Sequence, residues 1–109
     1  MTRAVDILAA LAQPSRLAIF RLLVQAGEEG LAAGAIGERL GLAPATLSFH
    51  LAQLTRAGIT ASRSQGRFVF YRADFGAMAH LLQYLTEDCC GGRACVPVPV
   101  APPRRRKAA

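Results

Sequence analysis

The residues with the most distinctive chemistry are three cysteines near the end of the sequence. They are Cys89, Cys90 and Cys95, and Gly91 and Gly92 lie between the second and the third. Thiolates are soft ligands that suit soft metal and metalloid ions. The two glycines let the chain turn so that the third sulfur faces the first two. The segment therefore predicts a thiol site that binds an ion or responds to oxidation.

Thiols also serve in disulfides, in zinc sites and in enzymes. Three cysteines are an odd number, which argues against a disulfide-stapled secreted domain. Zinc would need a fourth ligand from water, from His80 or from another subunit. A vicinal disulfide between Cys89 and Cys90 would be strained, but a redox-sensing role stays open. The chain lacks a Cys-x-x-Cys motif and any βαβ pattern, so we expect no enzyme.

The charge of the chain is concentrated in one stretch of the folded region. The formal net charge is +6, and residues 42–73 contribute four arginines and no carboxylate. An acid-free basic stretch of this kind is typical of a surface that meets a phosphate backbone. We therefore expect double-stranded DNA to be a partner of this stretch.

Length and composition predict one small domain followed by a tail. The chain has 109 residues, 52% of them hydrophobic, which suffices for a single core. We expect residues 1–88 to form the domain, residues 89–95 the thiol segment, and residues 96–109 a disordered, proline-rich basic tail. No apolar run reaches the roughly 18–20 residues that span a membrane. We also recognise no signal peptide, so we expect a cytoplasmic protein with no membrane partner.

Apolar periodicity and helix breakers divide the domain into five helices. The expected helices span residues 4–11, 14–26, 32–40, 44–57 and 75–88. Pro14 and Pro44 suit the first turns of their helices, and Asp74 can cap the last one. Gly41 ends the third helix just before the fourth begins. So short a connection between two helices is typical of a helix-turn-helix.

The fourth helix has the two faces that a DNA-reading helix requires. Leu47, Leu51 and Leu54 share a face expected in the core, while the opposite face holds short and polar side chains. Small residues allow close approach to a major groove, and Ser, Thr, Gln and Arg contact base edges and phosphates. Two strands follow, at residues 59–64 and 68–72, and form a wing. The expected fold is therefore mainly α with a small β-hairpin, a winged helix-turn-helix.

The first and last helices carry more apolar surface than one small domain can cover. The last helix has one stripe of Phe75, Met78, Leu82 and Leu85 and a second of Leu81 and Tyr84. The first helix has a stripe of Val5, Leu8 and Leu11, with Ile7 beside it. Because a small domain can bury only one stripe of each, we expect a two-fold homodimer through these two helices.

Several of these motifs occur in the order and spacing of one known family. They are Gln13-Pro14-Ser15-Arg16-Leu17, Leu40-Gly41-Leu42, Ala45-Thr46-Leu47-Ser48-Phe49-His50-Leu51 and the Gly66-Arg67 wing tip. Over residues 4–88 the chain resembles the ArsR/SmtB family of metal-responsive repressors. The resemblance implies a dimeric winged helix-turn-helix protein that leaves its operator when a metal or metalloid binds. It also implies DNA contacts from Thr46, Ser48, Phe49, His50 and Gln53 on or beside the recognition surface, and from Arg63 and Arg67 on the wing.

Departures from the family pattern narrow the choice of effector. One family site needs a Cys-x-Cys pair where this chain has Gly34-Ala35-Ile36-Gly37, and another needs Asp-x-His where it has Asp74-Phe75-Gly76. The remaining pattern resembles the subgroup with Cys-Cys-Gly-Gly and a further cysteine, whose members sense trivalent arsenic or antimony. That resemblance implies As(III) or Sb(III) bound by Cys89, Cys90 and Cys95, or a methylated arsenical, for which two sulfurs suffice. DNA binding itself needs no cofactor, and a redox-sensing repressor of the same fold is the alternative.

Overall fold

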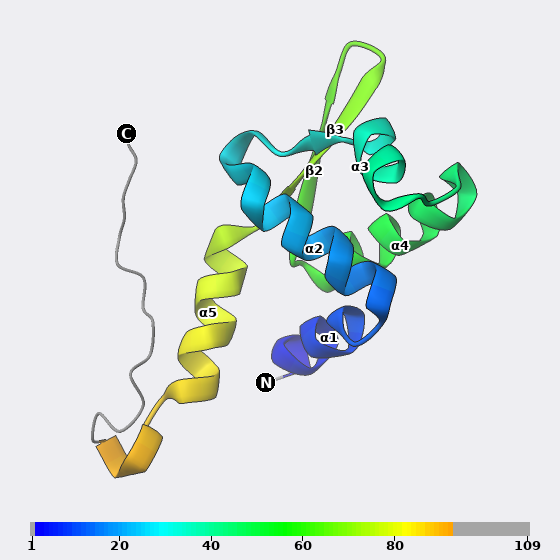
Figure 1. The fold of residues 1–109 in the computed structure, drawn as a ribbon. Helices are drawn as coiled ribbons and strands as arrows, with labels where there is room; N and C mark the ends of the chain where they lie inside the picture. Colours follow the sequence, from blue (N-terminus) through cyan, green and yellow to red (C-terminus); the bar gives the residue numbers. More distant parts are fainter. Residues whose placement is uncertain (1, 93–109) are drawn as a thin grey trace.

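The computed structural model describes residues 2–92, which form five α-helices and a three-stranded antiparallel sheet (Figure 1). The helices are α1 (Thr2–Leu11), α2 (Pro14–Ala26), α3 (Ala33–Leu40), α4 (Pro44–Ala57) and α5 (Phe75–Thr86). The strands are β1 (Leu31–Ala32), β2 (Thr60–Gln65) and β3 (Phe68–Ala73). Two short 3₁₀ turns, η1 (Gly27–Glu29) and η2 (Cys89–Gly92), complete the described chain. Cys95 and the predicted tail lie outside it.

Local capping explains why α2 and α5 begin where the sequence predicts. Pro14 opens α2, and the side-chain oxygen of Gln13 accepts a hydrogen bond of 2.8 Å from the backbone N–H of Arg16. Asp74 caps α5 as expected, because its Oδ1 accepts a hydrogen bond of 2.9 Å from the backbone N–H of Ala77. Each cap satisfies a donor that the first helical turn leaves unpaired.

The sheet is larger than the predicted hairpin. β1 pairs with β3, with Leu31 opposite Tyr71 and Ala32 opposite Phe70, so that the strand order is β1-β3-β2. The expectation of a hairpin alone was therefore incomplete. A strand of two residues is too short to show alternation in the sequence, and its place is fixed by pairing with a partner about 40 residues away.

The last helix is shorter than predicted. α5 ends at Thr86, not residue 88, and the Thr86 hydroxyl donates a hydrogen bond of 2.8 Å to the carbonyl oxygen of Leu82. Asp88 then takes a positive φ of 57°, which is incompatible with a continuing α-helix. The chain therefore turns before it reaches the first cysteine.

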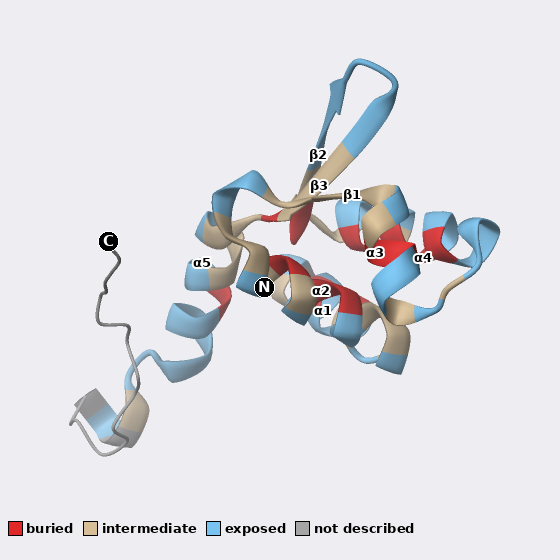
Figure 2. Ribbon diagram, turned by 45° about the horizontal axis from the view of Figure 1, so that its top comes forward, coloured by how far each residue is buried: buried red, intermediate tan, exposed pale blue. Residues whose placement is uncertain are grey.

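The core lies between α2, α3, α4 and the base of the sheet (Figure 2). Its fully buried large side chains are Ile19, Leu23, Ile36, Leu51, Leu54 and Ile59. Within residues 2–92 no single helix is long and apolar enough to cross a membrane. The segments of residues 3–11 and 14–29 meet that test only jointly, across a bend of 103°.

In α1 and α5 the buried and the exposed residues do not follow the predicted apolar stripes. In α1 the buried side chains are Ile7 and Ala10, whereas the predicted stripe residues Val5 and Leu8 are exposed. In α5 the first half packs on the core while Leu82 and Leu85 remain 54% and 53% exposed. The predicted stripe of α5 thus splits along the helix, because its second half extends past the body of the domain (Figures 1 and 2).

Gly30 is a position where the fold excludes any side chain. Its φ of 71° and ψ of −158° lie in a region that is essentially restricted to glycine, and an added Cβ would collide with the backbone carbonyl of Tyr71. Gly27 has nearly the same conformation, with φ 80° and ψ −161°, but open space around it. We expect Gly27→Ala to lower the free energy of unfolding by about 1–3 kcal/mol. Gly30→Ala should cost about 1–3 kcal/mol more, because the clash adds to the strain.

Chemical denaturation of both variants at one protein concentration tests this difference. Equal losses for Gly27→Ala and Gly30→Ala would contradict the close approach of the loop to β3.

Candidate DNA interface and thiol segment

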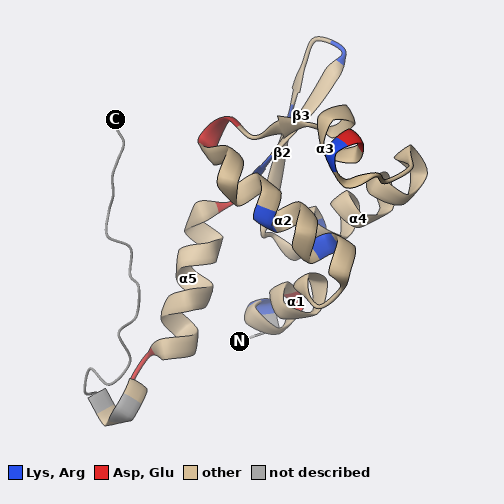
Figure 3. Cartoon of the chain, viewed as in Figure 1, with Lys and Arg blue, Asp and Glu red and all other residues tan. Residues whose placement is uncertain are grey.

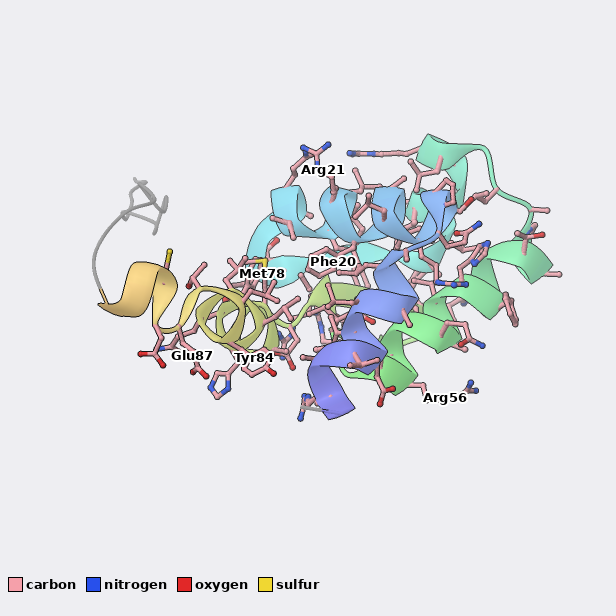
Figure 4. All side chains as sticks on the ribbon, turned by 90° about the horizontal axis from the view of Figure 1, so that it is seen from below. Phe20, Arg21, Arg56, Met78, Tyr84 and Glu87 are labelled. Carbon is pink, nitrogen blue, oxygen red and sulfur yellow. The ribbon has the colours of Figure 1, made fainter. Side chains whose placement is uncertain are left out.

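The outer face of α4 is open and free of acidic side chains. Leu47, Leu51 and Leu54 turn inward as predicted. The residues that turn outward and are exposed are Ala45, Phe49, Ala52 and Arg56, flanked by Thr46 and Ser48. Arg56 extends away from the core in Figure 4. The geometry is that of a helix able to enter a major groove with short side chains and to reach a phosphate at its end.

His50 does not lie on this surface. Only 8% of it is exposed, and its Nδ1 lies 3.3 Å from Nη1 of Arg16. A guanidinium only donates hydrogen bonds, so Nδ1 of His50 must accept this one. The side chain of His50 therefore packs beneath the outer face of α4, beside the recognition surface, and its contact with DNA stays a prediction.

Arg16 connects the recognition helix to the turn between α1 and α2. Its Nε donates a hydrogen bond of 2.6 Å to the carbonyl oxygen of Ala10, near the end of α1, while Nη1 reaches His50 on α4. Arg16 belongs to a motif that the sequence singled out only as part of a resemblance, and its partner lies 34 residues away. Gln53 is half-buried and shares a shallow pocket between α1 and α4 with Arg16.

The two wing arginines have different surroundings. Arg63 is exposed but engaged: its Nη1 donates a hydrogen bond of 3.2 Å to the carbonyl oxygen of Glu29, and its guanidinium carbon lies 4.8 Å from the centre of the Phe70 ring. The side chain of Arg63 on β2 thus extends across β3 toward η1, and its two contacts stabilise the wing. Arg67 is exposed in the turn that links β2 and β3, at the tip of the projecting hairpin (Figures 1 and 3).

The thiol segment follows directly after α5. Cys89 is half-buried and opens η2, where Gly91 takes a φ of 68° and donates a backbone hydrogen bond of 2.9 Å to Asp88. The backbone of Cys90 lies in the same turn, while Cys95 lies outside the described residues. Within residues 2–92 no three His, Cys, Asp or Glu side chains gather around a point that could hold a metal ion. A three-sulfur site therefore depends on Cys95.

The α5 helix contains no charged residue between Asp74 and Glu87, which mark its two ends in Figure 3. In Figure 4, Met78 lies on the side of α5 toward Phe20 of α2, and Tyr84 lies on another side. His80 is exposed and lines a groove between α1 and α5 together with Arg3 and Tyr84. An uncharged helix half exposed at the edge of a domain is typical of a subunit interface.

The chain matches known transcriptional regulators in sequence and structure. The family described as a helix-turn-helix domain matches residues 11–63. An uncharacterized HTH-type transcriptional regulator, YceK of Bacillus subtilis (strain 168), is 41% identical over 71 residues, covering 63% of this chain and 70% of that protein. HlyU from Vibrio cholerae N16961 has a TM-score of 0.62 at 33% identity, covering 82% of this chain and 94% of that one.

A third relative carries the same fold as a homodimer. It is the homodimeric winged helix-turn-helix DNA-binding domain Mb0332 from Mycobacterium bovis, described as a possible ArsR-family transcriptional regulator. Its TM-score is 0.64 at 26% identity, covering 84% of this chain and 85% of that one. This chain belongs to the ArsR/SmtB family. It is a DNA-binding transcriptional regulator and not an enzyme.

Membership in the ArsR/SmtB family confirms the predicted winged helix-turn-helix fold and DNA as a partner. The contacts of Thr46, Ser48, Phe49, Gln53, Arg63 and Arg67 with DNA stay predictions. These residues differ in their surroundings. Gln53 is half-buried, Arg63 is exposed but contacts Glu29 and Phe70, and the others are exposed to solvent.

The exposed leucines of α5 predict the dimer interface of this ArsR/SmtB protein. Leu82→Glu should place two carboxylates in one two-fold interface and remove two apolar contacts of about 1.5–3 kcal/mol each, weakening dimerisation at least about a hundredfold. Leu17→Glu on α2, where the side chain is 45% exposed, is the matched control and should remain dimeric. Sedimentation equilibrium measures both, and an unchanged dimer for Leu82→Glu would exclude α5 from the interface.

The wing tip predicts a salt-dependent contact. Arg67→Ala should weaken binding to a random-sequence duplex and reduce the slope of log affinity against log salt concentration by about 0.9 for each wing that touches a phosphate. Fluorescence anisotropy at several salt concentrations gives the slope. Arg21→Ala, an exposed arginine on α2 away from α4 (Figure 4), should leave it unchanged. Identical slopes for wild type and Arg67→Ala would remove the wing tip from the interface.

Proposed function

We propose that this regulator is a repressor that binds operator DNA as a homodimer and leaves it when trivalent arsenic or antimony binds Cys89, Cys90 and Cys95. The proposal rests on the position of the thiols directly after α5. Cys89 begins η2 only three residues after Thr86, the last residue of the helix whose exposed leucines predict the dimer interface. An ion captured there acts on the end of a dimerising helix.

The chemistry of the segment suits a soft, three-coordinate ion. Thiolates are the soft side-chain ligands of proteins, and a three-coordinate centre needs no fourth ligand, in contrast to structural zinc. Trivalent arsenic is present in water as As(OH)3, so three thiols replace three hydroxides and the three thiol protons leave in three water molecules.

Release from DNA follows from the geometry of the dimer. The second half of α5 extends beyond the body of its own domain, where a partner subunit would cover its exposed leucines. Gathering three sulfurs restricts the segment that continues α5 and alters the helix end. The distance or flexibility between the two α4 helices then changes, and the dimer no longer fits successive major grooves. Ion and DNA are thus negatively coupled, typically by about 1–3 kcal/mol.

A redox sensor is the second candidate, and the adjacency of Cys89 and Cys90 favours it. In that function an oxidant such as peroxide would take two electrons from two thiols, a disulfide would form, and DNA would be released. The same helix end would move in both cases. The two candidates therefore differ in the signal that the thiols detect, and both end in release from DNA.

Titration with arsenite tests the proposal. In a gel-shift assay under reducing conditions, arsenite should release the wild-type protein and lower its DNA affinity about 5- to 150-fold. Cys89→Ser and Cys90→Ser should bind DNA with wild-type affinity and not respond. Full DNA affinity in saturating arsenite would refute the proposal. Release by peroxide alone, with a disulfide detected by mass spectrometry, would establish the redox sensor in its place.

Cys95→Ser separates a three-sulfur site from a two-sulfur site. Phenylarsine oxide, in which carbon blocks one position of the arsenic, needs only two thiols. If Cys95 is a ligand, Cys95→Ser should lose most of its response to arsenite and keep its response to phenylarsine oxide. An unchanged response to both would reduce the site to Cys89 and Cys90.

A further inference from the structure

The recognition helix presents one large apolar side chain among small and polar ones. Phe49 on α4 is 57% exposed, and Ala45 and Ala52 lie one turn before and after it on the same outward face. Apolar surface is less favourable in water than when it is buried against a partner. An exposed phenylalanine flanked by alanines therefore forms an apolar strip that gains free energy when a partner covers it.

The ring of Phe49 is supported from below. Its centroid lies 5.5 Å from that of His50, with an interplanar angle of 61°, which is an edge-on aromatic contact. His50 is in turn buried and held by Nη1 of Arg16 at 3.3 Å. Edge-on aromatic pairs are favourable beyond the burial of their surface. The exposed ring thus has a defined position on the helix, as a residue that reads a base edge must have.

The occupant of this strip is DNA. The strip belongs to the outward face of the second helix of the helix-turn-helix, which is the element that enters the major groove in this architecture. Residues 42–73, which surround it in sequence, contain four arginines and no carboxylate, so the charge of this region is complementary to phosphate. Phe49 is the sixth residue of α4, in the half of the helix that contacts bases.

We propose that Phe49 determines sequence specificity by contacting the 5-methyl group of a thymine in the major groove of the operator. Thymine is the one base that presents a methyl group there, and phenylalanine and alanine are among the side chains that contact it. The other major-groove edges offer hydrogen-bonding atoms that a phenyl ring cannot satisfy, so covering them costs free energy. Phe49 therefore selects for an A·T pair of one orientation in each half-site. The proposal rests on DNA binding and not on the identity of the effector.

Deletion of single methyl groups from DNA tests this contact. The full-length protein, without effector, is used to select its preferred duplex from a random library, and each thymine is then replaced in turn by deoxyuridine. Base pairing is unchanged and only the methyl group is lost. We expect one position in each half-site at which deoxyuridine weakens binding about fourfold, the value of one buried methyl-sized group. Phe49→Ala should bind the thymine and deoxyuridine duplexes equally.

Phe68→Ala is the matched control. Phe68 is 59% exposed but lies on β3 of the wing, so this variant removes an equally exposed ring outside α4 and should keep the sensitivity to deoxyuridine. The thermal stability of Phe49→Ala verifies that the variant is folded. Wild-type binding that is insensitive to deoxyuridine at every thymine would overturn the proposal, as would undiminished sensitivity in Phe49→Ala.

Two further outcomes separate this inference from the proposed function. Failure of the library to yield any preferred duplex would overturn base reading by Phe49. A preferred duplex with the expected methyl effect, from which arsenite does not release the protein, would support the role of Phe49 and refute the arsenic response.

Discussion

The apolar half of α5 that extends beyond its own domain is the feature on which the rest of the structure depends. Leu82 and Leu85 are more than half exposed on a helix without a charged residue, and Val5 on α1 is 59% exposed. Full burial of each such side chain contributes about 1.5–3 kcal/mol, so a second copy of the chain is the natural cover. In a dimer formed through α5, this helix would also set the spacing of the two α4 helices and so how the protein meets DNA.

A short chain of contacts links the dimerising helices with the recognition helix. Arg16 holds the carbonyl oxygen of Ala10 at the end of α1 and the ring of His50 on α4. On the other side of His50 lies the exposed ring of Phe49. Three side chains, Arg16, His50 and Phe49, thus connect the end of α1 with the outward face of α4.

The sequence predicted the helices well because their ends are marked by residues with local effects. Pro14 and Pro44 open α2 and α4, Asp74 caps α5, and Gly41 ends α3 in a left-handed conformation with φ 67°. The strand β1 was missed because its two residues gain their structure only from pairing with β3. The early end of α5 was missed because the apolar pattern gives no sign of the turn at Asp88.

The side chains of the site were harder to predict than the helices that carry them. The resemblance placed His50 on or beside the recognition surface, since it lies at the border between two faces of the helix. Its buried contact with Arg16 joins residues that are 34 positions apart in the sequence. The engagement of Arg63 with Glu29 likewise spans 34 residues and follows from the path of β1, which no local pattern revealed. Contacts of this kind are set by the tertiary fold and not by spacing along one element.

Binding of arsenite to the thiol segment and binding of DNA to α4 should weaken each other. The most direct test is to measure this effect in both directions. The affinity of arsenite for the reduced protein should be measured by calorimetry without DNA and again with saturating operator duplex. If the two sites are coupled, DNA must weaken arsenite binding by the same factor by which arsenite weakens DNA binding. An arsenite affinity that is the same with and without DNA would contradict the account.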